Sequence, residues 1–150
     1  MSHLEHSTVT ITDLKALEAA CKTLGITFVE GKKSFTSYGN AQHPCNHAIT
    51  GFPGTNWEVG LLSADTNTNK ISYSLAYDPY SYGTNNGHPI TTKLCKQQAD
   101  GNYTKDGKHQ YEHLMNQYSL EVLKAKARLK GYQFQTTTVG GKLKLEVFAK

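Results

Sequence analysis

The sequence predicts an α+β fold, in which an antiparallel sheet of about five to seven strands carries two helices packed on one face. A helical pattern with one apolar stripe occurs twice, at residues 14–24 and 109–130, and a glycine follows each helix. Much of the remaining chain alternates apolar and polar residues with the period of a strand. Because a one-sided helix has to bury its stripe against another layer, we expect a single α+β domain over residues 1–150.

The N-terminal part predicts a strand, a helix and a second strand. Residues 7–11 alternate as a short strand, and Thr12 or Asp13 then offers a side-chain oxygen to cap the helix. Gly25 ends that helix, and Ile26 and Phe28 belong to the strand that follows. Further short strands are expected at residues 35–39, 48–52, 57–62 and 71–77, with a hairpin turn at 65–70.

The C-terminal part predicts a long helix and a hairpin. The helix ends near Lys130, Gly131 follows it, and two alternating strands close through Val139-Gly140-Gly141. We expect the helix to lie across this hairpin and any strands that extend it. The junction at Gly131 resembles the one at Gly25, which indicates either an internal pseudo-repeat or two independent uses of a helix-stop glycine.

Residues 78–108 predict a long irregular insert, because they are rich in Asn, Gly and Tyr and lack periodicity. Tyrosine offers a large contact area with few rotatable bonds, and Asn and Gly adapt around it. We therefore interpret the chain as a non-enzymatic binding or adaptor module whose Tyr-rich loop contacts a protein partner. The predicted contact residues are Tyr80, Tyr82, Asn85, Asn86 and His88.

A metal or small-molecule site, with hydrolytic chemistry, is the alternative interpretation. His43, Cys45 and His47 alternate in an extended segment and could converge on zinc, helped by the helix histidines His109 and His113. Residues 109–113 also read HxxEH, an inverted zinc-peptidase motif. No CxxC pair supports the first cluster, and the motif lacks a convincing third ligand, so we expect neither catalytic residues nor a cofactor.

Composition and charge limit the remaining classes. The net charge is +4, and Lys124 and Arg128 point away from Lys126 and Lys130 on the helix, so no basic ridge forms for a nucleic acid. No apolar run approaches the roughly 20 residues of a membrane span. The N-terminus lacks signal-peptide features and the three cysteines suit a reducing compartment, which predicts a cytoplasmic protein. An uncovered sheet face or edge would allow a homodimer.

Three stretches of the chain resemble the Ycf35-like family, also called the domain of unknown function 1257 family. They are Met1-Ser2-His3 with residues 12–17 and Leu24-Gly25, then the hairpin from Trp57-Glu58-Val59-Gly60 to Asp78, and Leu114-Met115-Asn116-Gln117-Tyr118-Ser119 through Lys130-Gly131-Tyr132 to the terminal hairpin. The resemblance rests on their order and spacing. It implies a small cytosolic α+β protein and supplies no catalytic residues, because the family has no established activity. The longer insert after Asp78 departs from the family pattern, as expected of a divergent, phage-borne member.

Overall fold

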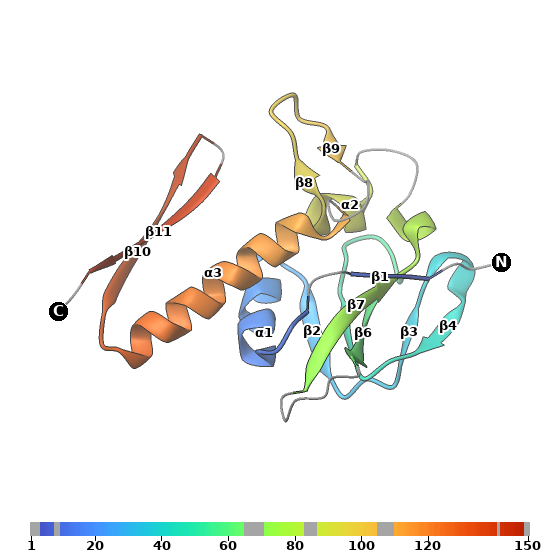
Figure 1. Ribbon diagram of the computed structural model, residues 1–150. Coiled ribbons are helices and arrows are strands. Elements are labelled where there is room, and N and C mark those ends of the chain that lie inside the picture. Colours follow the sequence, from blue (N-terminus) through green and yellow to red (C-terminus); the bar gives the residue numbers. More distant parts are fainter. Residues whose placement is uncertain are drawn as a thin grey trace.

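A five-stranded antiparallel sheet forms the centre of the molecule, as the sequence predicts (Figure 1). The computed structural model describes residues 4–7, 10–64, 71–82, 87–104, 110–140 and 142–148. The strands, in spatial order, are β1 (Glu5–His6), β7 (Ser72–Tyr77), β6 (Val59–Ala64), β5 (His47–Thr50) and β2 (Thr27–Glu30). The N-terminal strand lies at Glu5–His6, before the predicted residues 7–11, and of that predicted range Ile11 forms an isolated bridge with Tyr73. The turn at 65–70 lies outside the described residues.

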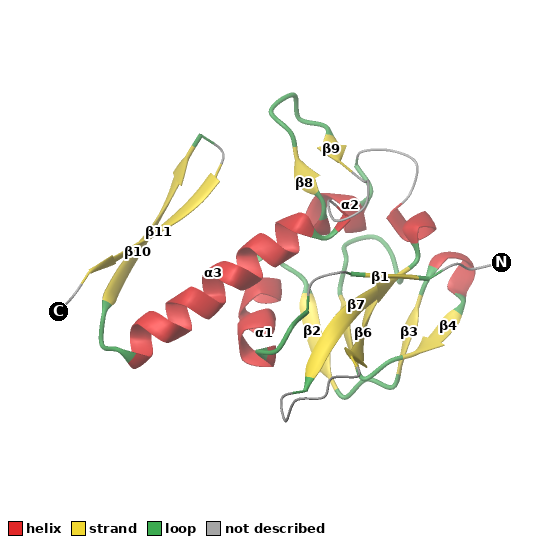
Figure 2. Cartoon of the chain, in the orientation of Figure 1, coloured by secondary structure: helices red, strands yellow, loops and turns green. Residues whose placement is uncertain are grey.

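Helices α1 (Leu14–Thr23) and α3 (Glu112–Leu129) lie side by side and share the main core with the sheet (Figure 2). Asp13 caps α1, because its Oδ1 accepts a hydrogen bond from the backbone N–H of Ala16 at 3.0 Å. The core joins side chains from both helices and from one face of the sheet, including Leu17, Cys21, Phe28, Ile49, Val59, Leu61, Leu75, Leu114 and Tyr118. None of the helices in the described part of the chain has the length and apolar character that a membrane crossing requires.

The opposite face of the sheet carries a second, smaller core. A hairpin of β3 (Ser34–Thr36) and β4 (Gln42–Pro44) places the buried ring of Phe35 against this face. The ring lies directly over Gly60, where the absent side chain leaves the space that it occupies. Alternation along β5 explains the two cores, because Ile49 belongs to the main core and Ala48 to the smaller one.

The C-terminal hairpin does form, but it does not extend the sheet. Strands β10 (Gln133–Val139) and β11 (Lys142–Phe148) pair with each other in an antiparallel register and form a separate two-stranded sheet. Figure 1 shows them apart from the central sheet, beyond the end of α3. The prediction that α3 lies across a continuous sheet including this hairpin was therefore wrong. The buried face of α3 is already occupied by α1 and the main core.

The region from residue 78 to 108 contains more regular structure than its composition suggested. Its described elements are η2 (Pro79–Tyr82), α2 (Pro89–Leu94), β8 (Lys96–Gln97) and β9 (Tyr103–Thr104). Helix α2 buries Ile90 and Leu94, one turn apart, in the main core. The prediction of an irregular insert therefore fails here because this segment carries apolar residues that the core needs.

Candidate binding site

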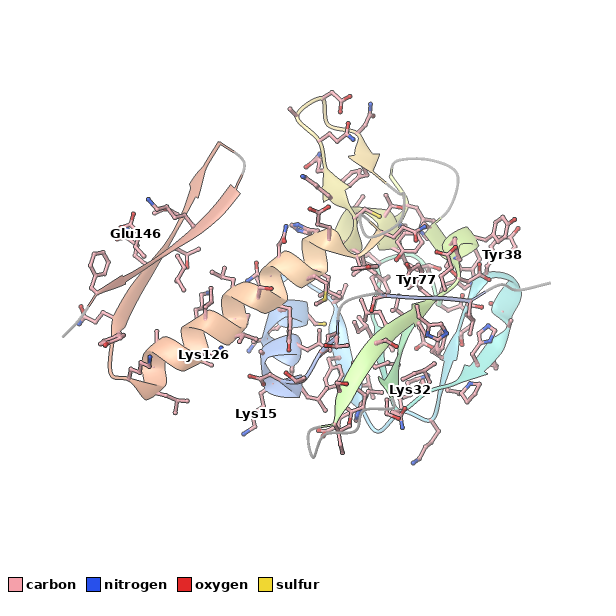
Figure 3. All side chains as sticks on the ribbon, viewed as in Figure 1. Lys15, Lys32, Tyr38, Tyr77, Lys126 and Glu146 are labelled. Atoms are coloured by element: carbon pink, nitrogen blue, oxygen red, sulfur yellow. The ribbon has the colours of Figure 1, made fainter. Side chains whose placement is uncertain are left out.

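Four aromatic side chains from separate parts of the chain form one cluster, which we call the aromatic patch: Tyr38, Trp57, Tyr80 and His88. The ring centroids of Tyr38 lie 5.2 Å from Trp57 and 5.7 Å from Tyr80. The His88 ring stacks on Trp57 at 5.6 Å with an interplanar angle of 19°. Tyr80 is 64% exposed and Tyr38 is 50% exposed, so this cluster presents ring surface to solvent. Figure 3 shows Tyr38 at the edge of the molecule, beside η2.

The two tyrosines of the aromatic patch are held by turns that hydrogen-bond to each other. Tyr38 begins η1 (Tyr38–Asn40), and its backbone N–H donates to the buried Ser81 Oγ at 2.9 Å. Asp78 is fully buried, and its Oδ1 accepts from the backbone N–H of Tyr80 at 3.0 Å. These bonds fix the two backbones from which the exposed rings project.

Glu58 holds the backbone next to Trp57. Its Oε1 accepts from the backbone N–H of Thr36 at 2.8 Å, and its own N–H donates to the Thr36 carbonyl at 2.7 Å. Lys32 Nζ lies 3.2 Å from the same carboxylate oxygen, and the Glu58 side chain is only 12% exposed. The carboxylate thus ties Trp57 to the β3–β4 hairpin, whose connection carries Tyr38.

His88 occupies the N-cap position of α2. Its Nδ1 accepts a hydrogen bond from the backbone N–H of Ile90 at 3.3 Å, and Pro89 takes the first helical position, where an N–H is not required. The cap orients the imidazole against Trp57.

An open groove of about 640 Å³ borders the aromatic patch on the side of Trp57 and His88. It is lined by Gly39, Asn40, Gly54, Thr55, Asn56, Trp57, His88 and Pro89. This described lining includes no Asp, Glu, Lys or Arg, and its polar character comes from amide and hydroxyl groups. Two of the lining residues hydrogen-bond to each other, because Asn56 Nδ2 donates to Asn40 Oδ1 at 3.1 Å. The site therefore combines aromatic faces with neutral hydrogen-bonding groups.

A second groove, of about 760 Å³, lies beside α1. It is lined by Thr12, Asp13, Leu14, Lys15, Glu18, Phe28, Glu30 and Ile71. Asp13 already caps α1, and Phe28 belongs to the main core. This groove is the larger of the two, but its described lining contains no cluster of exposed aromatic rings, so the aromatic patch is the stronger candidate.

The residues predicted to contact a partner fall into three groups. Tyr80 and His88 lie in the aromatic patch. Tyr82 does not: it is 1% exposed, and its hydroxyl donates to the Gln110 carbonyl at 2.8 Å. Burial also raises the pKa of its hydroxyl well above its ordinary value. Its role as a contact residue was therefore wrong, because the ring fills the core. Asn85 and Asn86 lie outside the described residues.

The residues of the alternative metal site at 43–47 each make a separate hydrogen bond within the protein. His43 Nε2 shares a hydrogen bond with Ser37 Oγ at 2.8 Å, and Cys45 Sγ donates to the Lys32 carbonyl at 3.1 Å. His47 Nδ1 accepts from the Gly31 N–H at 2.8 Å. Throughout the described part of the chain, no group of three or more His, Cys, Asp or Glu is placed to hold a metal ion. The zinc interpretation therefore has no geometric support among these residues.

The described part of the HxxEH segment is partly buried: Gln110 and Tyr111 are buried, and Glu112 and His113 are half-buried. Glu112 pairs with Lys96 at 3.8 Å, and burial, with Lys93 nearby, lowers the pKa of His113. His109 is outside the described residues.

The three cysteines are free and buried. Burial, with a smaller effect from Glu18, raises the pKa of Cys21 to about 12. Burial also raises the pKa of Cys45, although Lys32 acts in the opposite direction. Because the thiolate is the nucleophile, these environments disfavour cysteine catalysis at neutral pH.

Two members of the aromatic patch, Tyr38 and Trp57, were not predicted from the sequence. Trp57 is the single tryptophan of the chain and follows a Gly- and Asn-containing turn, which is a local signal for a ring near the surface, and it is partly buried against the main core. Its contact with Tyr38 depends on the β3–β4 hairpin and has no local signal. Comparison of the chain with protein families, curated proteins and solved structures finds no match. The resemblance to the Ycf35-like family therefore stays a prediction.

Proposed function

We propose that the protein is a non-enzymatic binding module, and that the aromatic patch with its groove binds a short extended segment of a partner protein. The observation that carries the proposal is the contact among Tyr38, Trp57 and Tyr80, with both tyrosines at least half exposed. Tyrosine and tryptophan are the residues that most often dominate protein interfaces, because they bury a large area at a small cost in side-chain entropy.

The neutrality of the groove favours a peptide over a nucleic acid. Nucleic-acid binding depends on Lys and Arg contacts with phosphate, and the described groove lining has none. An extended peptide offers backbone carbonyls and N–H groups, which Asn40, Asn56 and Thr55 can bind, while its apolar side chains pack on the aromatic rings. We therefore expect the bound segment to be uncharged at the groove, and binding to change little with salt.

The surroundings of the cysteines are compatible with action in the cytoplasm. All three thiols are free and buried, and a reducing compartment preserves that state. We therefore place the partner segment in the same compartment.

Selection from a displayed library of random peptides tests the proposal. Peptides enriched on the wild-type protein are titrated against it while the fluorescence of Trp57 is followed, because this is the only tryptophan in the chain. We expect Tyr38→Ala and Tyr80→Ala to weaken binding by about tenfold or more, as loss of an interface hot spot does. Tyr132→Ala is the matched control, since Tyr132 is 40% exposed and lies next to the C-terminal hairpin.

Two results would overturn the proposal. In the first, the enriched peptides bind the Tyr38 and Tyr80 variants as tightly as the wild-type protein. In the second, no peptide is enriched, and an oligosaccharide array gives binding that the same two variants lose. The aromatic patch would then recognise a sugar instead of a protein segment.

A further inference from the structure

The C-terminal hairpin forms a two-stranded sheet of its own. Two-stranded hairpins are marginal in water unless a third strand or another layer supports them. Among the described residues, no other strand pairs with β10 or β11. Seven large hydrophobic side chains of the described chain are exposed, and three of them lie in the hairpin or within four residues of it in the sequence: Leu129, Tyr132 and Phe148. Leu129, at the end of α3, is 89% exposed.

We propose that a second copy of this chain pairs with the hairpin, with β11 lying antiparallel to β11 of the other copy. The product is a continuous four-stranded sheet in the order β10–β11–β11–β10, with a two-fold axis at Leu145. A two-fold interface uses the same patch on both copies, so one strand has to be complementary to itself. The open edge of β11 supplies the backbone hydrogen bonds that the monomer leaves to water.

Length and charge select the same register for this pairing. Leu145 is the central residue of β11 (Lys142–Phe148), so only a two-fold axis at Leu145 pairs all seven residues of the strand. In that register Lys144 of each copy lies opposite Glu146 of the other. Both side chains are accessible, with exposures of 61% and 41%, and within one chain their charged atoms are 3.6 Å apart. Cross-strand pairs of opposite charge stabilise antiparallel strands.

Neighbouring registers pair fewer residues of the strand and place like charges opposite each other. Side chains that pair across a two-fold axis have to lie on the same face, so the possible centres are single residues. An axis at Lys144 places that lysine opposite its own copy, and an axis at Glu146 does the same for two carboxylates. Each of these two axes also leaves fewer residues of β11 paired with β11 of the other copy. Lysine on an edge strand ordinarily hinders pairing, but here Glu146, two residues further along, provides the opposite charge.

Charge reversal tests the register directly. Sedimentation velocity of the wild-type chain over a concentration series is expected to show a monomer–dimer equilibrium. Lys144→Glu alone, or Glu146→Lys alone, makes both cross-strand pairs repulsive, and we expect the dissociation constant to rise about tenfold or more. A mixture of the two single variants places each new charge opposite its complement, so heterodimers with near wild-type affinity are expected. The double variant K144E/E146K restores both pairs and should form a homodimer.

Lys33→Glu is the control, because it makes the same change of charge at an exposed position far from the hairpin. It should leave the dissociation constant unchanged. A chain that stays monomeric at all concentrations, or a dimer whose affinity the single reversals leave unchanged, would overturn the proposal. Heterodimers no stronger than the single-variant homodimers would overturn the register. Peptide binding, followed through Trp57, is independent of these outcomes, so the two proposals can fail separately.

Discussion

Gly60→Ala would test how closely the smaller core is packed. A Cβ added at Gly60 would lie 2.4 Å from Cδ1 and 2.5 Å from Cε1 of Phe35, whereas ordinary van der Waals contact begins at 3.4 Å. The ring would have to move by about 1 Å (3.4 − 2.4 Å), and Phe35 is fully buried, so neighbouring side chains have to move as well.

The magnitude follows from two opposing effects. Overpacking a dense core costs about 1–3 kcal/mol of unfolding free energy. Alanine regains about 0.5–1 kcal/mol relative to glycine inside a strand, because the unfolded chain loses less entropy on folding. We therefore expect Gly60→Ala to destabilise the protein by about 1–2 kcal/mol. Urea unfolding, followed by circular dichroism, measures this as a lower midpoint with an unchanged slope.

A double-mutant cycle with Phe35→Leu identifies the cause. The leucine side chain is smaller than the ring, so Gly60→Ala should cost clearly less in the Phe35→Leu background than in the wild-type protein. An equal cost in both backgrounds would refute the contact as the origin of the loss. So would a Gly60→Ala protein as stable as the wild type.

Two further predictions concern helix α3. Tyr118→Phe should destabilise the protein by about 1–3 kcal/mol, because the Tyr118 hydroxyl accepts hydrogen bonds from the backbone N–H groups of Thr12 and Asp13, both at 3.1 Å. His113→Gln should flatten the pH dependence of stability. Burial and Lys93 lower the folded-state pKa of His113 below 6.5, so the unfolded chain binds more protons than the folded chain. The stability of the wild-type protein therefore falls as the pH drops below that value, and the variant should lose part of this fall.

Both predictions have matched controls. Tyr132→Phe removes a hydroxyl from an exposed tyrosine and should leave the urea midpoint nearly unchanged. His6→Gln changes an exposed histidine, and its stability should fall with acid as the wild type does. Tyr118→Phe with wild-type stability, or His113→Gln with an unaltered acid dependence, would show that these contacts contribute little.

Local signals in the sequence located the C-terminal ends of α1 and α3 correctly, whereas α3 begins at Glu112 and not at the predicted residue 109. Gly25 and Gly131 both adopt positive φ, 77° and 73°, and both donate to the carbonyl three residues back. The next residue in each case, Ile26 or Tyr132, donates to the carbonyl five residues back, which completes a Schellman motif. The strands that follow enter different sheets, so the shared junction favours independent use of one helix-stop motif over a pseudo-repeat.

The fate of the two tyrosines in η2 could not be predicted from local composition. Tyr80 and Tyr82 are two residues apart in a similar setting, yet one is exposed and the other fills the core. The difference arises from distant residues: the Tyr82 hydroxyl needs the Gln110 carbonyl, and its own carbonyl accepts from Thr91 Oγ1 at 2.7 Å. Pro89, interpreted as a loop residue, instead starts α2, a position where proline is favoured.

The aromatic patch and the C-terminal hairpin lie at opposite ends of the molecule, as the positions of Tyr38 and Glu146 in Figure 3 show. In a dimer joined through β11, the two copies of the patch would therefore sit at the far ends of the assembly. A partner that carries two suitable segments would bind both patches when the distance between its segments matches the distance between the patches. The second attachment would then become intramolecular, and avidity could exceed that of one patch by roughly 10²- to 10⁴-fold.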